Sequence, residues 1–559
     1  MAGLVKMFGA GAMTNSIPEI RDTDLMFVIG SNTTEAHPII AMEMKRARQA
    51  GAKLIVADPR RIWLADYADV HLQLKPGTDV FLLNAMAKVI VDEGLVDQGF
   101  IDNHTKGWQA LKQSLEKFPL DEAERVTRVP AELIKKAAIM YASTYKAGVY
   151  YTLGITEHSH GTDNVYSLAN LVLMTGHLGR RSSGLNPLRG QNNVQGANDA
   201  GASPVFYPGY QSATDPEVRA KFSEAWNCDA PGAGMNLNQM MHAVEEGEMK
   251  ALFVMGEDIV LSEPNTSKLE EGLKDLEFLV CQEILPNMTT EYADVILPGA
   301  CFAEKDGVFT NSDRRVQRVR KGVNPPGNAR ADWQILVDLA RAAGYDMPRY
   351  NTAADVYAEM ASLAPKFAGI SHERIDANPK GMQWPCVDAD DPGTEFLHGD
   401  GPLSGKAGFQ PVEYRASLEL PDDDYPLILS TGRTLYHYNS ATQTRREAGP
   451  DTKQGEMFVE VNPELAEEVG VADGEIVKIA SRRGGIKAKV VLTDRVRKHS
   501  VWMPLHFAEE SVNYLTNDVG DAVTGTPEYK VCAVTMIPLR NRQKAGGGLA
   551  KAVLQSKQE

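Results

Sequence analysis

Short apolar runs that end in polar or glycine-rich turns recur along the first third of the chain. Residues 25–30 form a continuous apolar run, residues 40–50 have helical spacing with a basic outer face, and residues 54–57 form a second apolar run that ends in Asp58. Strand, helix and strand in so short a stretch predict a right-handed βαβ unit. The same patterns predict strands over residues 71–74 and 149–153 and helices over residues 80–93 and 165–178.

A second set of the same kind begins near residue 211. Residues 250–255, 276–281 and 293–297 are apolar runs, and residues 333–344 have the spacing of an amphipathic helix that we expect Asp332 to cap. Because parallel α/β sheets bind nucleotides at the carboxyl ends of their strands, the repeat predicts two similar nucleotide sites. Asp58 and Asp79 would accept hydrogen bonds there from ribose or base, or would cap helices.

The pattern changes after residue 426, where five apolar runs alternate with turns such as Asp473-Gly474. This alternation of apolar runs and turns predicts a β-barrel domain. We therefore expect an α/β protein with one α/β domain over residues 1–191, a second over 192–415, a barrel over 416–540 and a flexible tail over 541–559. Residues 368–425 are rich in Pro, Gly, Asp and Ser and are typical of a long connection.

Composition narrows the range of partners. The 559 residues carry a net charge of −16, which argues against nucleic acid or an anionic membrane as a partner. No apolar run is long enough to span a membrane. The five cysteines are scattered without a CxxC pair, which indicates a reduced cytoplasmic chain that offers no zinc or iron–sulfur site of its own.

One polar loop, residues 186–202, carries candidate chemistry. It sets Arg189 among glycines and carboxamides, including Gln191, and is too polar for a core strand and too rich in Gly and Asn for a long helix. An arginine among amides suits a small planar anion, because the guanidinium pairs bidentately with a carboxylate. The alternative is a solvated turn with a surface arginine.

Several segments together resemble one family. They are RGQNNVQGA (189–197), ADVILP (293–298), GVFTNSDRRVQ (307–317), ADWQI (331–335), TGR (431–433) and TPEYKVCAV (526–534). They resemble the molybdopterin oxidoreductases, and most closely the catalytic subunits of molybdenum- or tungsten-dependent formate dehydrogenases. The resemblance runs from the first residues to about residue 538. It implies two doubly wound α/β domains and a six-stranded barrel of the double-psi type.

The resemblance also implies a cofactor and residue roles. Two molybdopterin guanine dinucleotides (bis-MGD) would chelate one molybdenum or tungsten atom. Formate would give up a hydride to a sulfur ligand of this metal, and carbon dioxide would leave. Arg189 would hold the formate carboxylate, and Gln191 would support the pocket. The loops around one dinucleotide would include Gly30, Asn32, Glu35, Asp58, Lys75, Gly77, Asp79 and Gly154. Those around the other would include Gly256, Glu257, Gln282, Glu283 and Asp332.

The barrel would contribute further residues near the pterins and phosphates: Thr431, Gly432, Arg433, His437, Asn513, Tyr529 and Lys530. Simpler interpretations stand beside these roles, since His437 suits a hydrogen-bonded buried histidine and Lys530 a surface lysine. His158 and His160 resemble a ligand pair, but we expect solvation at a strand end, because the metal in this family is held by sulfur.

The family's cysteine or selenocysteine ligand, the histidine after it, and the domain with a [4Fe–4S] cluster all precede the Ala2-Gly3-Leu4 match. We therefore expect these 559 residues to be part of a longer protein or a natural split subunit, inactive on formate alone. Fe–S and flavin subunits are expected as electron-transfer partners. The alternatives are another molybdopterin oxidoreductase, for instance of nitrate, a non-catalytic cofactor-binding subunit, or a generic two-domain nucleotide-binding protein.

Overall fold

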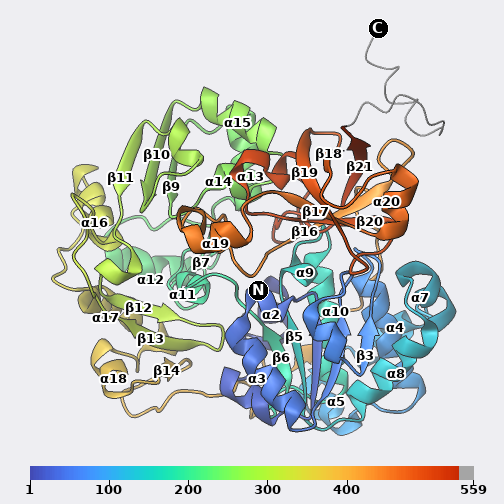
Figure 1. The fold of residues 1–559 in the computed structure, drawn as a ribbon. Coiled ribbons are helices and arrows are strands. Elements are labelled where there is room, and N and C mark those ends of the chain that lie inside the picture. Colours follow the sequence, from blue (N-terminus) through green and yellow to red (C-terminus); the bar gives the residue numbers. More distant parts are fainter. Residues whose placement is uncertain (540–559) are drawn as a thin grey trace.

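The computed structural model describes residues 1–539, so the predicted tail over 541–559 lies outside the described residues. The described chain forms two α/β units and a barrel, which Figure 1 shows packed around a common centre. Within residues 1–539 no helix combines the length and the apolar character that a bilayer span needs.

The first unit is built on a five-stranded parallel sheet in the order β3-β2-β1-β5-β6. The chain winds outward from β1 in one direction and then continues from β5 on the other side, so the switch point of a doubly wound sheet lies between β1 and β5. The strands are β1 (Leu25–Ile29), β2 (Lys53–Ala57), β3 (Val70–Leu72), β5 (Ala147–Tyr151) and β6 (Gly184–Pro187).

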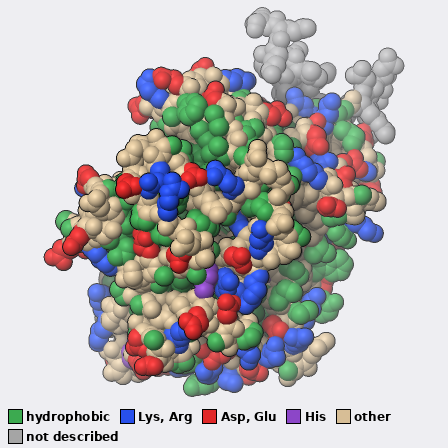
Figure 2. All heavy atoms as spheres, turned by 90° about the vertical axis from the view of Figure 1, so that its left-hand side faces the viewer, with side chains coloured by type: hydrophobic (Ala, Val, Ile, Leu, Met, Phe, Trp, Pro, Cys, Tyr) green, Lys and Arg blue, Asp and Glu red, His purple; other side chains and the backbone are tan. Residues whose placement is uncertain are grey.

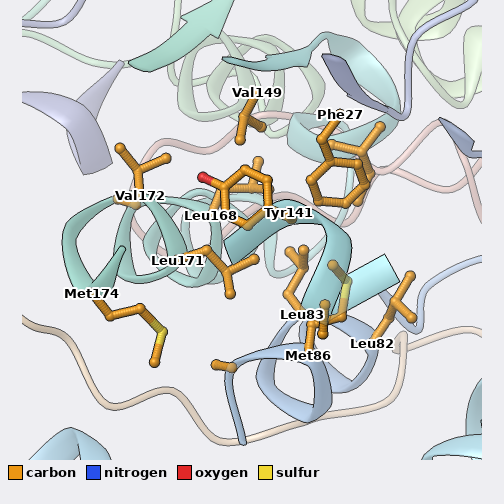
Figure 3. Packing of buried hydrophobic residues seen from close by; sticks show 14 of the residues in the cluster. Phe27, Leu82, Leu83, Met86, Tyr141, Val149, Leu168, Leu171, Val172 and Met174 are labelled. Carbon is orange, nitrogen blue, oxygen red and sulfur yellow. The ribbon is translucent and has the colours of Figure 1, made fainter. Parts of the chain in front are cut away.

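Helices cover both faces of this sheet. Phe27 on one face packs in a large core with α4 (Asp79–Asp92), α8 (Ala131–Ala142) and α10 (Gly161–Met174), which Figure 3 shows around Tyr141 and Leu168. Val28 on the other face packs with α3 (Pro38–Gln49). The strands are buried on both faces, as their continuous apolar runs predict.

Two local predictions are corrected here. The strand predicted over 149–153 ends at Tyr151, and Leu153 opens the short helix α9 (Leu153–Thr156). Residues 186 and 187 are not too polar for the core, because they end the fully buried β6. The Asn186 carboxamide is satisfied there, since it accepts from the Asn15 N–H and donates to the Ser183 carbonyl.

The second unit has a three-stranded parallel sheet in the order β11-β10-β9. The strands are β9 (Ala251–Met255), β10 (Phe278–Glu283) and β11 (Val295–Pro298), and α13 (Leu237–Glu245) and α15 (Thr266–Asp275) pack on one face. On the other face Phe253, Met255 and Phe278 are 38%, 47% and 46% exposed. Figure 2, which looks at this side of the molecule, shows a hydrophobic patch in its upper part.

Asp332 does not cap the following helix. It is the first residue of α16 (Asp332–Ala342), and the flanking residue is Ala331. The Asp332 carboxylate instead accepts from Gln282 Nε2 at 2.8 Å and pairs with Lys305. The motif over 307–317 forms an antiparallel hairpin of β12 (Gly307–Thr310) and β13 (Arg315–Val319).

The long connection returns to the first unit. Its strand β15 (Ala407–Gly408) pairs with β4 (Thr105–Lys106), and Ala407, Phe409 and Val412 belong to the large core around α4. These residues lie on the second-domain side of the predicted boundary at 415, yet they pack in the first core.

The third unit is a closed six-stranded barrel in the order β16-β20-β17-β19-β18-β21. Its strands are β16 (Leu427–Gly432), β17 (Phe458–Val461), β18 (Ile476–Ala480), β19 (Gly485–Leu492), β20 (Ser500–Pro504) and β21 (Cys532–Pro538). Parallel and antiparallel pairs alternate irregularly around it. The barrel lies over the carboxyl edge of the first sheet (Figure 1), and the six-stranded prediction is confirmed.

Candidate functional site

A cleft of about 970 Å³, here called the first cleft, lies between the carboxyl edge of the first sheet and the barrel. The loops after β1, β2 and β5 form its floor, and β16 and β20 form its roof. Nine predicted site residues line it: Gly30, Asn32, Asp58, Asp79, Gly154, Thr431, Gly432, Arg433 and Lys530. The switch point of the sheet therefore opens into a cleft, as the strand pattern predicts.

Two glycines at this switch point are required by close approach of the backbone. A Cβ on Gly30 would lie 2.7 Å from the Gly154 carbonyl carbon, and one on Gly154 would lie 2.6 Å from the Gly30 Cα. Gly30 also has a left-handed φ of 55°. Any side chain would push the ends of β1 and β5 apart and deform the floor of the cleft.

Buried charge characterises the first cleft. The carboxylate of Asp79 lies 3.8 Å from His158 Nε2, whose Nδ1 lies 3.6 Å from Glu528. All three side chains are at most 6% exposed. Burial raises the pKa of Asp79 and the His158 charge opposes this, while Glu528 and Asp79 raise the pKa of His158 against its burial. The geometry thus favours an imidazolium between two carboxylates.

The carboxyl group of Asp58 lies in the same cleft. Burial raises its pKa to about 7, although it accepts a hydrogen bond from the Arg60 N–H at 2.9 Å. Its affinity for protons suits an acceptor that is completed by a donor from a ligand.

A buried ion pair joins the cleft floor to the barrel. Arg60 donates from Nε and Nη2 to the two carboxylate oxygens of Glu460, at 2.6 and 2.5 Å, and its guanidinium lies 4.0 Å from the centre of the Trp502 ring. Such a bidentate, stacked arginine has one fixed geometry. It fixes the barrel over the loop after β2.

The second cleft, about 1040 Å³, lies at the carboxyl edge of the second sheet. It is lined by all five residues predicted for the other dinucleotide: Gly256, Glu257, Gln282, Glu283 and Asp332. The opposite wall is the barrel loop that contains Tyr438, Asn439 and Gln443. Lys305 pairs with Asp332 inside this cleft.

Each cleft contains a buried polar atom without a partner among residues 1–539. In the first cleft Nδ2 of Asn32 is such an atom, as is Nδ1 of His158, and in the second it is Oε1 of Gln282. An unpaired buried donor or acceptor costs free energy unless a ligand or water satisfies it. Asn32 lies three residues after the end of β1 and Gln282 is the penultimate residue of β10, so the two clefts are equivalent in position.

The arginine loop lies between the two clefts. A Cβ on Gly190 would lie 3.6 Å from the Arg433 guanidinium, which lines the first cleft. Gln191 Nε2 donates to Asn439 Oδ1 at 3.0 Å, and Asn439 lines the second cleft. The loop therefore lies beside the first cleft and is hydrogen-bonded to the wall of the second, and the short helix α11 (Val194–Asp199) follows it. The interpretation as a free solvated turn is wrong.

Arg189 is half-buried in this loop. Its Nη2 donates to the Gly11 carbonyl at 2.6 Å and its Nε donates to Gln195 Oε1 at 3.0 Å. The carbonyl of Arg189 contacts His37 Nε2 at 2.8 Å. The segment that follows α1 (Ala2–Phe8) thus lies beside the arginine.

The other predicted residues lie outside the two clefts. Asn513 and Tyr529 donate to carbonyls at the end of α14 (Ile259–Ser262), so their polar atoms join the barrel to the second unit. His437 contacts Thr444 and the Gln454 carbonyl, which matches a hydrogen-bonded buried histidine. Glu35 pairs with Arg495 at 3.9 Å. Any cofactor contact of these residues, and of Lys75 and Gly77, stays a prediction.

Lys530 is not a free surface lysine, because it pairs with Glu157 at 2.6 Å and donates to the Thr431 carbonyl. The expected solvation of His158 is wrong, since the ring is buried in the first cleft. Sequence reasoning also missed Arg60 and Lys305. A polar residue just after a strand end is the only signal for Arg60 and His158, and their partners Glu460 and Glu528 lie hundreds of residues away.

Comparison with known proteins identifies the family. The model described as "Molybdopterin oxidoreductase" matches residues 6–342, which is more than half of the chain, and "Molydopterin dinucleotide binding domain" matches residues 427–533. The chain belongs to the molybdopterin oxidoreductases. The two matches cover the first two units with their clefts and the barrel, so the family assignment made from the motifs is confirmed.

Individual members of the molybdopterin oxidoreductases are similar over nearly the whole chain. The F420-dependent formate dehydrogenase subunit alpha of Methanocaldococcus jannaschii is 45% identical over 96% of this chain and 79% of its own length. Formate dehydrogenase H of Escherichia coli is 38% identical over 98% and 77%. The assimilatory nitrate reductase catalytic subunit of Bacillus subtilis is 35% identical over 95% and 77%.

A solved structure shares the fold. Acetylene hydratase from Pelobacter acetylenicus superposes with a TM-score of 0.76 at 19% sequence identity, over 96% of this chain and 80% of its own. This likeness confirms the arrangement of α/β units and barrel.

Proposed function

We propose that this molybdopterin oxidoreductase interconverts formate and carbon dioxide, with a molybdopterin guanine dinucleotide in each cleft and formate bound by Arg189 between them. The observation that carries the proposal is the position of Arg189, in a loop that lies beside Arg433 of the first cleft and is hydrogen-bonded through Gln191 to Asn439 of the second. A substrate held there would lie where two cofactors meet.

The first cleft fits the guanine end of such a cofactor. Guanine presents two adjacent N–H donors, and the buried carboxyl groups of Asp58 and Asp79 are acceptors without enough protein donors. Asn32 offers its unpaired Nδ2 to an acceptor of the ligand. Arg433 and Lys530 provide positive charge at the roof for phosphates. These residues would orient the dinucleotide along the strand edge.

The second cleft fits a second copy of the same ligand. Glu257 and Glu283 again place carboxylates at strand ends, Asp332 adds one from the start of α16, and Gln282 has an unpaired buried Oε1. Lys305 supplies the one lysine ammonium among the described residues that line this cleft. The metal centre of the bound cofactors would supply the two-electron redox chemistry.

Arg189 would bind and orient the carboxylate of formate. Its guanidinium donates to the buried Gln195 and acts electrostatically on the buried Tyr151, so its charge lies in partly buried surroundings. A charge-assisted pair is strong in such surroundings and fixes the direction of the C–H bond. Gln191 would hold the loop in place through Asn439.

Partner subunits and the identity of the metal complete the proposal. The name "subunit alpha" of three relatives supports partner subunits, and we propose Fe–S and flavin subunits that carry electrons in the cytoplasm. The metal is molybdenum or tungsten, held with bis-MGD, and a [4Fe–4S] cluster would be carried outside the described residues. The nitrate reductase at 35% identity makes nitrate reduction the second candidate.

The test compares formate and nitrate as substrates of the assembled enzyme in a dye-linked assay. Formate-dependent dye reduction is expected. Arg189→Lys should lower its kcat/KM about 100-fold, because the loss of one oriented charged contact has an effect of that size on the rate. Arg181→Lys is the matched control, since Arg181 lies in an exposed pair with Glu395. Nitrate-dependent dye oxidation without formate turnover would overturn the proposal.

A further inference from the structure

A buried network of polar side chains supports Arg189 from behind. Gln195 Oε1 accepts from Arg189 Nε at 3.0 Å, and its Nε2 donates to Asp199 Oδ1 at 2.9 Å and to the Tyr210 hydroxyl at 2.7 Å. Tyr210 donates in turn to Asp199 Oδ1 at 2.7 Å, and Trp384 Nε1 donates to Asp199 Oδ2 at 2.8 Å. Gln195, Asp199 and Trp384 are at most 2% exposed.

The network fixes which way the Gln195 carboxamide points. Asp199 is an acceptor on both oxygens when it is ionised, so the side of Gln195 that faces it must be the NH₂ group. The Gln195 carbonyl oxygen then faces Arg189 and can only accept. With Nε held there and Nη2 held by the Gly11 carbonyl, the plane and rotation of the guanidinium are determined. The remaining nitrogen, Nη1, is then directed by its neighbours and can donate to a ligand.

Two residues of this network, Tyr210 and Trp384, have an unusual conformation or environment. Tyr210 adopts a left-handed φ of 63°, a conformation that a non-glycine residue holds only when its surroundings impose it. Trp384, completely buried, directs its only side-chain donor at Asp199. Neither Asp199 nor Gln195 lines a cofactor cleft, so cofactor binding does not explain the arrangement.

We infer that Gln195 and Asp199 are positioning residues that set the orientation of Arg189 for a planar carboxylate substrate, with Tyr210 and Trp384 fixing Asp199. The inference rests on the proposed function for its substrate, formate. It predicts that the ionised form of Asp199 is the competent one, because a protonated carboxyl would no longer demand the NH₂ side of Gln195.

The charged groups around Asp199 are compatible with this requirement. Burial raises the pKa of Asp199 to about 6, and the hydrogen bonds from Tyr210, Gln195 and Trp384 and the charge of Arg189 oppose the rise. Arg314 and Lys366 also face Asp199 as cations, and Tyr357 faces it as a neutral phenol, since its pKa is raised by burial. Asp199 is therefore ionised above about pH 6.

The decisive variant is Asp199→Asn in the assembled enzyme. The new carboxamide would keep an oxygen on Trp384 and turn its NH₂ toward Gln195, which must then rotate and present its own NH₂ to the Nε–H of Arg189. The expected result is a rise of about tenfold or more in the formate KM with a smaller change in kcat, because a hydrogen bond to a charged group is lost from substrate binding. The acid limb of kcat/KM near pH 6 should also disappear.

The double variant Gln195→Glu with Asp199→Asn provides the rescue. A carboxylate at position 195 can accept both from a carboxamide at position 199 and from Arg189 Nε, so the formate KM should return to within about threefold of wild type. Tyr210→Phe, which keeps the direct contact between Gln195 and Asp199, should give an intermediate KM. The Tm of each variant is measured as a control for folding. Anion binding without turnover is measured separately, as the protection that formate gives Arg189 against modification by phenylglyoxal, detected by peptide mass spectrometry.

The outcomes separate the two proposals. A folded Asp199→Asn enzyme with unchanged formate KM and pH profile would overturn the inference while the proposed function stands. A double variant as impaired as Asp199→Asn would also overturn it. A wild-type enzyme that turns over nitrate and not formate would overturn the proposed function, and the same variants then test the positioning role through the nitrate KM.

Discussion

The two clefts occupy equivalent places at the ends of parallel strands, but their electrostatic surroundings differ. In the first cleft His158, Asp79 and Glu528 are almost completely buried under the barrel. In the second cleft the Lys305–Asp332 pair is 23% and 32% exposed, and Glu257 is exposed. The same strand-end geometry therefore produces one dry, pre-arranged site and one that water can partly screen.

The difference comes from what covers each sheet edge. Strands β16 and β20 lie over the first cleft, whereas the loop that contains Tyr438 and Asn439 walls the second. Charges buried under the barrel cannot turn toward water, so the loss of a protein partner is poorly compensated there. Substitutions in the first cleft should accordingly cost more than equivalent ones in the second.

The largest effect is expected for Arg60→Met. It leaves the buried Glu460 with only the more distant Arg495, at 3.7 Å, and breaking a buried pair in this way costs about 3–5 kcal/mol of unfolding free energy. The matched control near the second cleft is Arg330→Met, whose exposed pair with Asp338 contributes at most about 1 kcal/mol. Equal losses of stability in chemical denaturation would remove the contrast between the clefts.

The next effect concerns retention of the proposed cofactor. Asp79→Asn should lower bound guanine nucleotide in the first cleft by roughly 10-fold or more, because a buried charge-assisted hydrogen bond is weakened. Asp332→Asn should lower it less, since Asp332 is partly exposed and already paired with Lys305. Acid release of GMP from purified protein, quantified per chain, measures both. A greater loss from Asp332→Asn would reverse the order of the clefts.

A pH dependence should distinguish the clefts as well. The folded pKa of Asp58 is about 7, above its unfolded value near 4, so its contribution to stability is fully present below pH 4 and is lost as pH rises toward 7. Asp58→Asn should therefore raise Tm at pH 8 relative to wild type, with little gain at pH 5. If the gain were the same at both pH values, burial of Asp58 would not be the cause.

The smallest effect is expected between the clefts. Asn439→Ala removes the acceptor of the Gln191 side chain, a hydrogen bond worth about 1 kcal/mol. The formate KM should rise severalfold with Tm almost unchanged. Asn192→Ala serves as the control, because its contact with Tyr438 is made through the backbone N–H and survives the substitution.

Much of this architecture is predictable because it depends on local pattern. Continuous apolar runs locate β1, β2, β9 and β10, and the polar residues after them line the clefts. Arg189 and its loop are recognisable from composition and resemblance. The residues that support Arg189 are not recognisable from the sequence. Gln195 acts through Asp199 and through Trp384, which is 185 residues further along the chain than Asp199.

Long-range satisfaction of polar groups explains the errors. The polarity of Asn186 argues against a core strand, but the Asn15 backbone and the Ser183 carbonyl satisfy its side chain. The sequence places His158 in solvent, but Glu528 lies beside it in the folded chain. Asp332 has the position of a helix cap, but Gln282 and Lys305 engage its carboxylate. Apart from Ser183, these partners lie far from the residue in the sequence.

The return of residues 407–412 to the first core has a consequence for synthesis on the ribosome. Phe409 packs on Trp108, and the core around them includes Ala407 and Val412. At about 5–20 residues per second, roughly 15–60 s pass between the appearance of these two aromatic residues. During that interval the nascent first unit exposes the apolar groove that β15 and its neighbours will fill. This is the period in which a chaperone that covers the groove would protect the chain most.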